Sequence, residues 1–420
     1  MMQNTAPGTT THVATALWPI GLATALSLMG DATLYAVLPT HSADAGIALA
    51  GVGIVLSINR FIRLITNSPA GWLIDRLPDR RILFISSLTL GVVATTVYAT
   101  SSDLIALLFG RLLWGLAWSG IWIGGNAIVL QMAPEAQRGH WVGIYQVWFF
   151  FGSALGSLVG GTMTDIVGYR EALWIGASIS AVGALAAFAL PSASKPIERA
   201  RLTLAPLGIS LRKSIRDISS PMWATATAQG VNRLAAAGIV SATLGLVVQE
   251  SLGTQVHLGA WQIGVASVTG GLLGSRTLIS LVGAPFAGKW SDNAGQRWGL
   301  LAMSLLLGAL GTGVLAAPNI LIVVAGTVAG AIASGSIQAL TTALAGDLSS
   351  GNMHGKNLGF FNTAGDFGSA IGPLFAYALL PMIGLSAIYI GCAILMLGVA
   401  TWVTRFRQSQ PTHLLDRPEP

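Results

Sequence analysis

Long apolar runs separated by short polar connections are the dominant pattern of this sequence. Each run has about 20 residues, which is the length that an α-helix needs to cross the hydrocarbon core of a bilayer. The strands of a membrane barrel would be shorter and would alternate in polarity. We therefore predict an all-α membrane protein with twelve transmembrane helices. The predicted spans lie at roughly 15–39, 46–67, 82–100, 104–130, 141–163, 171–190, 222–249, 260–283, 298–316, 319–345, 358–381 and 385–404.

The composition and the placement of the charges support this interpretation. Hydrophobic residues make up 53% of the 420 positions and charged residues 9%, against about 25% charged residues in soluble domains. The net charge of +6 does not indicate nucleic-acid binding, because sixteen of the 22 Lys and Arg residues lie in one set of alternate loops and the C-terminal tail, while the other set holds only Arg170. Positive charge marks the cytoplasmic side. We therefore predict a multi-pass protein of the cytoplasmic (inner) membrane with both termini in the cytoplasm.

Two motifs occur twice in the chain. The polar turn Gly71–Arg81 returns as Gly288–Arg297, and in both copies a Gly stands four residues before an Asp and an Arg five residues after it. Gly-Ser-Ala-Leu-Gly at 152–156 returns as Gly-Ser-Ala-Ile-Gly at 368–372. This duplication predicts two pseudo-symmetric six-helix bundles, and transporters of that architecture bind their solute between the halves near mid-membrane. The predicted segments are a disordered cytoplasmic tail at 1–14, bundles at 15–190 and 221–404, a cytoplasmic linker at 191–220 and a tail at 405–420.

The repeated motifs resemble those of the major facilitator superfamily over roughly residues 15–404. Gly71–Arg81 is similar to the loop 2–3 signature of that superfamily, although Pro78 and Asp79 stand where Gly and a basic residue are usual, and Gly288–Arg297 is similar to the loop 8–9 counterpart. The glycine spacing of the fifth span resembles that of the 12-helix drug:proton antiporters, with Ser157 in place of their usual Pro. The resemblance implies a monomeric secondary transporter that is coupled to protons and has no cofactor.

The repeated residues are candidates for gating and for helix packing. Glycine lets helix ends approach closely, and by the resemblance the Asp and Arg side chains pair across the gap as a latch between conformational states. The alternative is a solvated basic turn that only fixes the topology. The candidate gating residues are Gly71, Asp75, Arg76, Arg80, Gly288, Asp292 and Arg297. Small residues four apart allow helices to pack backbone to backbone, and the candidates are Gly152, Gly156, Gly160, Gly368, Gly372 and, with them, Pro373.

Asp31 is the only acidic residue deep in a predicted span of the first half. A carboxylate in the bilayer costs roughly 2–3 kcal/mol or more, which makes it a candidate functional residue, and a proton can neutralise it. Arg111, with Leu107 four residues before it and Gly115 four residues after it, resembles the arginine-bearing motif of the antiporters' fourth helix. We therefore predict that Asp31 and Arg111 couple transport to protons. The alternative is a static ion pair that only holds two helices together.

Other polar and aromatic side chains within the spans indicate a solute cavity. Trp114, Trp118 and Trp122 share a helix face with Arg111, unless that face is a stripe exposed to lipid. The arginines within the spans outnumber the acids, so the cavity would be positive and would suit an organic anion, unless some arginines extend to the membrane surface. The predicted cavity residues are Tyr35, Asn59, Arg60, Arg63, Asn67, Trp114, Trp118, Trp122, Asn232, Arg233, Arg276, Asn362 and Asp366.

The sequence contains no catalytic or metal-binding constellation. It has no phosphate-binding Gly-x4-Gly-Lys-Ser/Thr motif and no His-Glu-x-x-His, and Cys392 is its single cysteine, so we expect neither an enzyme nor a metal site. The favoured function is proton-coupled efflux of a small organic solute by alternating access. The alternatives are uptake or exchange of an organic anion held by the arginines, and a membrane receptor or membrane-embedded enzyme. The expected partners are an anionic or amphipathic small molecule, protons and the lipid bilayer.

Overall fold

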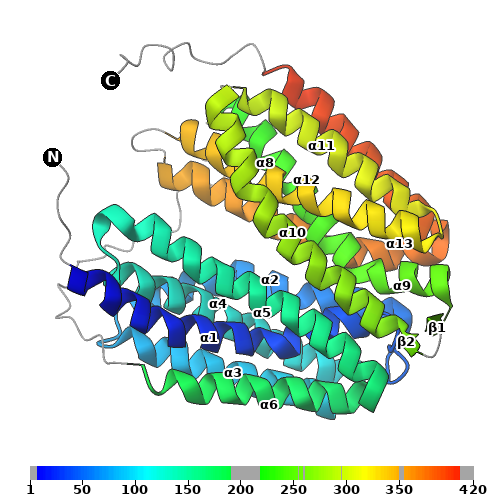
Figure 1. The fold of residues 1–420 in the computed structure, drawn as a ribbon, viewed down its shortest axis with the longest axis horizontal. Coiled ribbons are helices and arrows are strands. Elements are labelled where there is room, and N and C mark those ends of the chain that lie inside the picture. The colour runs from blue at the N-terminus through cyan, green and yellow to red at the C-terminus, as the bar shows by residue number, and fades with distance from the viewer. Residues whose placement is uncertain are drawn as a thin grey trace. The chain divides into compact units, whose positions relative to one another are not determined.

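The structure is a computed structural model and describes residues 7–190, 218–253, 255–258, 261–294, 296–349 and 354–406. The part of the chain that it describes is almost entirely helical (Figure 1). The first elements are α1 (Pro7–Val37), α2 (Leu49–Ile74), α3 (Arg80–Thr100), α4 (Leu104–Met132), the 3-10 helix η1 (Glu135–Gln137), α5 (Arg138–Val167) and α6 (Tyr169–Ala187). There follow α8 (Ser220–Asn232), the π-helix η2 (Arg233–Val240), α9 (Ser241–Leu252), β1 (Gln255–Leu258), β2 (Trp261–Gly264), α10 (Val265–Ala294), α11 (Arg297–Gly313), the 3-10 helix η3 (Val314–Ala316), α12 (Ile320–Asp347) and α13 (His354–Thr404).

The spans agree with the apolar runs, with differences at their ends. Ten helices of the described chain are long and apolar enough to cross a membrane. The run at 171–190 forms the 19-residue α6, which is not among the ten, and the last two runs both lie in α13, whose helical geometry is interrupted at Gly384 (φ 76°). A twelve-span arrangement therefore remains a prediction. Helix α1 begins at Pro7, eight residues before the predicted start of the first span.

Polar side chains determine where several helices begin. The carboxylates of Asp79 and Asp103 accept hydrogen bonds from the backbone of Arg81 and Ala106, both at 2.9 Å, and so cap α3 and α4. Asn319 caps α12 in the same way. These caps satisfy N–H groups that the first turn of a helix leaves without a partner. The connection between α9 and α10 is an antiparallel hairpin in which Gln255 pairs with Gly264.

The chain divides into two compact units. The first comprises Met1–Ile197 and Ser241–Leu278, and the second comprises Glu198–Val240 and Ile279–Pro420. The sequence placed the boundary at 191–220, whereas the structure assigns α9 and the first half of α10 to the first unit because α9 contacts α1 and the start of α10 contacts α5. Most of the predicted linker and tails lies outside the described residues.

Each unit contains the same tight helix pair, built on small residues. In the first unit α5 packs along α1, where Gly152, Gly156 and Gly160 face Ala25, Ala32 and Thr33, respectively. In the second unit α13 packs along α8 and η2, where Gly368 and Gly372 face Gly230 and Gly238, and Pro373 is buried beside them. A Cβ at any of these five glycines would meet backbone or side-chain atoms of the facing helix, so small residues are required there. Large apolar side chains such as Ile105 and Leu321 are exposed on the outside of the spans, as expected for a surface in contact with lipid.

Candidate functional site

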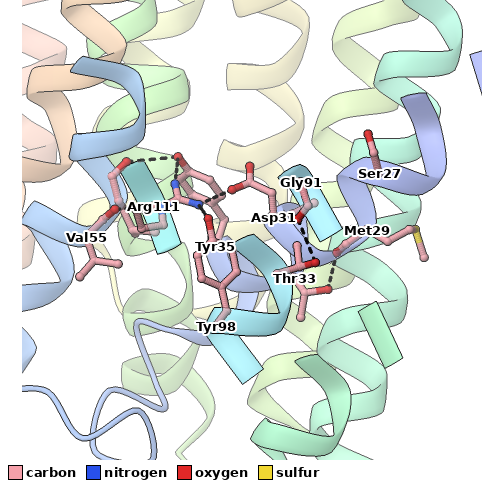
Figure 2. A network of polar contacts seen from close by, with 12 residues as sticks. Ser27, Met29, Asp31, Thr33, Tyr35, Val55, Gly91, Tyr98 and Arg111 are labelled. Carbon is pink, nitrogen blue, oxygen red and sulfur yellow. Dashed lines mark hydrogen bonds and ion pairs between the residues drawn. The ribbon is translucent and has the colours of Figure 1, made fainter. Parts of the chain in front are cut away.

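Asp31 of α1 and Arg111 of α4 form a buried ion pair in the first unit (Figure 2). The Arg111 side chain is fully buried and that of Asp31 is 13% exposed. The Arg111 guanidinium also donates to the carbonyl of Val55 through Nε (3.0 Å), to the Tyr98 hydroxyl (3.3 Å) and to the Tyr35 hydroxyl (3.1 Å). Four of its five N–H groups are thus directed at named acceptors. The carboxylate is the only charged group among these acceptors, so its ionisation determines the net charge of the site.

Four helices of the first unit bring these groups together. Asp31 and Tyr35 lie one turn apart on α1, and the Tyr35 hydroxyl donates to the carbonyl of Leu56 on α2 at 3.2 Å. The guanidinium carbons of Arg60 and Arg111 both lie near the Tyr35 ring, at 5.1 Å and 5.3 Å from its centroid. Such distances permit cation–π attraction. Tyr35 therefore connects the ion pair to Arg60, which is partly exposed on α2.

Close packing of α2 on α4 fixes the position of Arg111 along the axis of α2. A Cβ at Gly115 would lie 2.6 Å from the carbonyl oxygen of Asn59, so only glycine fits there. One turn further along, the Thr66 and Ser119 hydroxyls are hydrogen-bonded at 2.7 Å. Asn59 is 3% exposed, and its Oδ1 has no hydrogen-bond partner within the described chain. On α1 the Thr33 hydroxyl, two residues after Asp31, donates to Met29 (2.6 Å) and to Gly156 of α5 (3.2 Å), which anchors this part of the helix.

The chemistry available to this site is a change of protonation state. A positive neighbour favours the ionised form of a carboxyl group, whereas burial favours its neutral form. When Asp31 is ionised, the pair is held by a charge-assisted bond, which is stronger than a bond between neutral groups. When Asp31 carries a proton, Arg111 retains only neutral acceptors. The two states therefore differ in how firmly α1 is held to α4.

The three tryptophans of α4 form a stack inside the helix packing. Neighbouring ring centroids are 6.2 Å and 5.9 Å apart, and Phe149 of α5 contacts both Trp118 and Trp122. Trp114 is 1% exposed and covers Gly91 of α3. In this structure the Trp114 ring fills the space between α3 and α4, so a role of Trp114 in lining a cavity stays a prediction. Trp122 retains partial exposure.

The remaining predicted cavity residues are divided between the two units. In the first unit Arg63 and Asn67 are partly exposed on α2, and Arg276 of α10 donates to the Ser241 hydroxyl at 3.0 Å. In the second unit the buried Asn232 ends α8 and Arg233 begins the π-helix, while Asn362 and Asp366 lie on α13. The structure thus places Tyr35 and Arg60 beside the Asp31–Arg111 pair, whereas Asn232, Arg233, Asn362 and Asp366 lie in the second unit.

Two polar groups of importance were not identified from the sequence. Tyr98 is the buried hydroxyl partner of Arg111, and a tyrosine within an apolar span should have suggested one, because a buried hydroxyl usually needs a hydrogen-bond partner. In the second unit Gln229 of α8 donates to Gln338 of α12 at 2.6 Å and accepts from Thr341 at 3.2 Å. Glutamines are common enough on polar helix faces that these two residues gave no distinct signal.

The loop motifs connect helices within each unit. Arg80 donates to the carbonyl of Ala127 on α4 at 3.1 Å, and the equivalent Arg297 forms an ion pair with Asp347 at the end of α12. The exposed Asp75 forms no ion pair in the part of the chain that the structure describes, and Arg76 stacks 3.7 Å from the centroid of the Trp72 ring.

The close approach expected at the motif glycines is absent. A Cβ at Gly71 or Gly288 would meet no described atom within 4 Å, because the helix ends are not packed together at these two positions in this structure. The side chain of Asp292 lies outside the described part of the chain. The gating role of the loop motifs therefore remains a proposal, and the contact available to test it is the Arg297–Asp347 pair.

Replacing Asp347 by Asn should loosen the contact of α11 with α12. The pair is partly exposed, at 22% and 54% of the two side chains, so the expected loss is at most about 1 kcal/mol, or up to about a fivefold change in a conformational ratio. We expect the thiol-labelling rate of a cysteine at the buried Leu344 to rise by no more than that factor. The charge swap Arg297→Asp with Asp347→Arg should restore the original rate. The control is Glu135→Gln, which removes an exposed surface pair with Arg138. An equal rise of the labelling rate in that control would contradict the conclusion that the Arg297–Asp347 pair holds α11 to α12.

The sequence of this chain is similar to those of known membrane transporters. A family model described as Major Facilitator Superfamily matches residues 20–276 and 225–420. Multidrug resistance protein MdtG of Escherichia fergusonii is 25% identical over 368 residues, which cover 86% of this chain and 85% of MdtG. An uncharacterized MFS-type transporter of Mycobacterium tuberculosis is 27% identical over 266 residues. That alignment covers 59% of this chain and only 38% of the length of the relative.

Solved structures share the fold at low sequence identity. The crystal structure of a variant of the nucleoside transporter NupG matches with a TM-score of 0.75 and 12% identity, covering 94% of this chain and 99% of that chain. A bacterial homolog of the human lysosomal transporter Spinster, in an inward-facing and occupied conformation, matches with a TM-score of 0.73 and 15% identity, covering 97% and 98% of the two chains.

Proposed function

Since this chain belongs to the Major Facilitator Superfamily, as its repeated loop motifs predicted, we propose that it exports a small organic solute in exchange for protons. Membership makes it a multi-pass membrane transporter. The coupling to protons rests on the buried Asp31–Arg111 pair. The outward direction rests on the similarity to MdtG, which is named as a multidrug resistance protein.

The ion pair supports coupling because only one of its members can exchange a proton. Arginine remains protonated in proteins, whereas a carboxyl group can bind and release a proton. Arg111 is fully buried, but the Asp31 side chain retains 13% exposure, so a proton can reach the carboxylate without disturbing the arginine. In this scheme protonation weakens the hold of α1 on α4, and deprotonation restores it.

A second candidate function is transport of an organic anion. Its support is the position of Arg60, which is partly exposed and lies 5.1 Å from the centroid of the Tyr35 ring. Asp31 balances the charge of Arg111, and Arg60 and Arg63 add two further guanidinium groups to α2. A solute carboxylate would suit these groups, with its apolar part against the exposed edge of Trp122.

The proposed topology has twelve spans with both termini in the cytoplasm. Cysteines introduced at Arg80 and Arg297, at the starts of α3 and α11, should resist a membrane-impermeant thiol reagent added outside cells. A cysteine at Arg170, at the start of α6, should react, because three helices separate it from Arg80. The buried Cys392 is replaced by Ala in all three variants. Labelling in the opposite pattern would reverse the assignment of every loop.

Proteoliposomes with an imposed pH gradient test the proposed function. Fluorescent lipophilic cations and fluorescent aromatic carboxylates are supplied side by side. We expect at least one compound to be concentrated against its gradient, and a protonophore should abolish this accumulation. Accumulation of carboxylates alone would favour the second candidate. If no compound moves faster than in protein-free liposomes, both candidates fail.

A further inference from the structure

The end of α5 and the beginning of α10 are joined by a hydrogen bond that neither helix could form alone. Asp165 lies in the last turn of α5, and its Oδ2 accepts a hydrogen bond of 2.7 Å from the backbone N–H of Ser267. Ser267 is the third residue of α10, which begins at Val265. That N–H is one of the groups that the first turn of a helix leaves unpaired. Asp165 therefore caps α10 from a different helix, and we refer to this contact as the α10 cap.

The residue that would normally supply this cap has no side chain. A helix is usually capped by the residue immediately before its first turn, with Ser, Thr, Asp or Asn preferred. In α10 that position is Gly264. A Cβ there would collide with the carboxylate of Asp165. The carboxylate thus occupies the space in which a capping side chain from Gly264 itself would lie.

Behind the α10 cap, the two helices meet through backbone atoms. A Cβ at Gly161 would collide with the carbonyl of Ala266, and a Cβ at Gly270 would collide with the carbonyl of Ser157. One turn further, Gly274 faces the carbonyl of Ala154, where a Cβ would lie 2.8 Å from the oxygen. Among the described residues of this seam, no ion pair joins the two helices. The exposed bond from Ser267 to Asp165 at the end of the seam is therefore the charge-assisted contact between them, and it depends on orientation.

We propose that Asp165 is a gating residue that closes the α5–α10 seam by capping α10, and this inference rests on the proposed transport cycle. Helix α10 continues from the first unit into the second at Leu278–Ile279. A movement of the second unit therefore acts on the seam through a continuous helix. Opening the seam on the outer side breaks the α10 cap, and because Gly264 has no side chain, α10 cannot recap itself. In the open state the first turn of α10 is therefore uncapped. Closure of the seam is favoured because it returns α10 to the carboxylate of Asp165.

Thiol labelling at the seam measures this effect directly. Ala266 is fully buried in the first turn of α10, so a cysteine there, in a Cys392→Ala background, reports exposure of the seam. Asp165→Ala should raise its labelling rate by a membrane-impermeant maleimide by about fivefold, the ratio to which the loss of a typical helix cap corresponds. Gly264→Ala should give a similar rise without changing Asp165, because its methyl group displaces the carboxylate. An unchanged rate in both variants would overturn the proposal.

The control for simple loss of a cap is Asp103. It immediately precedes α4, the helix that it caps through a bond of 2.9 Å from Ala106. Asp103→Ala should lower the melting temperature and leave labelling at position 266 unchanged. If it raises the labelling as much as Asp165→Ala does, the rise reflects general destabilisation, and the gating role is contradicted.

A second variant separates gating from helix capping. In the Asp165→Ala background, Gly264→Ser gives α10 a capping side chain of its own, because the space is then empty. We expect the melting temperature to recover while the labelling rate stays raised, since the bond between α5 and α10 is still missing. Recovery of both would show that Asp165 only stabilises α10. If the labelling rates respond as expected but the protein shows no proton-driven flux, the gating role of Asp165 stands and the proposed proton coupling is rejected. If proton-driven flux is present but the labelling rates do not respond, the proposed coupling stands and the gating role is rejected.

Discussion

Asp31→Asn should reduce proton-driven accumulation of solute to the level of protein-free liposomes, while solute binding and downhill exchange continue. Asn has nearly the shape of Asp and can still accept a hydrogen bond from Arg111, so we expect the fold and the packing of α1 on α4 to be retained. It cannot bind and release a proton, so the gradient is no longer linked to the conformational cycle. The measurement is uptake into proteoliposomes with and without an imposed pH gradient, for the native protein and the variant.

The control for this experiment is an acid that lies outside the ion-pair network. Glu171 in the first turn of α6 is exposed and contacts Gly168, so Glu171→Gln should transport like the native protein. If Asp31→Asn still concentrates solute in response to the gradient, the proton carrier is another group. Asp366 of α13, the other acid deep within a predicted span, is then the next residue to replace.

Arg111→Ala should be the most destabilising single change in the first unit. It removes the partner of a buried carboxylate and leaves the Val55 carbonyl and the hydroxyls of Tyr35 and Tyr98 without their donor. Breaking a buried pair from one side typically costs about 3–5 kcal/mol. We therefore expect a large loss of correctly inserted protein and a clearly lower melting temperature in detergent.

Removing the Asp31 carboxylate as well tests whether the loss in Arg111→Ala comes from an unpaired buried charge. Adding Asp31→Asn to Arg111→Ala removes the uncompensated carboxylate, so the double variant should be more stable than Arg111→Ala alone, with a coupling energy within about 0.5–3 kcal/mol. Arg138→Ala is the matched control, because its pair with Glu135 is exposed and should contribute at most about 1 kcal/mol. Additive losses from Asp31 and Arg111 would mean that the two residues act independently.

The span pattern could be predicted from the sequence because burial in lipid requires long apolar segments, and the repeat could be predicted because both halves pack the same small residues. Gly152 and Gly156 of α5, which pack on α1, correspond to Gly368 and Gly372 of α13, which pack on α8 and η2. The Asp31–Arg111 pair was also predictable, since the cost of a charge within the membrane leaves few acceptable partners.

What could not be predicted depends on contacts between distant segments. Nothing in the spacing of Trp114 distinguishes a cavity wall from a ring that fills the space over Gly91. The hydroxyl of Tyr98 and the carbonyl of Val55 approach Arg111 only after three helices have packed together. The α10 cap likewise joins two residues 102 positions apart, and a glycine at the start of a helix gives no indication of which distant carboxylate replaces the missing side chain.

Proton release on solute binding is the most direct test of the central claim, that Asp31 binds the coupling proton. A compound identified by transport is titrated into purified protein by calorimetry, in buffers that differ in their heat of protonation, so that the slope of heat against buffer enthalpy gives the number of protons exchanged. The account predicts release of protons from the native protein and none from Asp31→Asn, with binding retained in both. Equal proton release from the two proteins would contradict it.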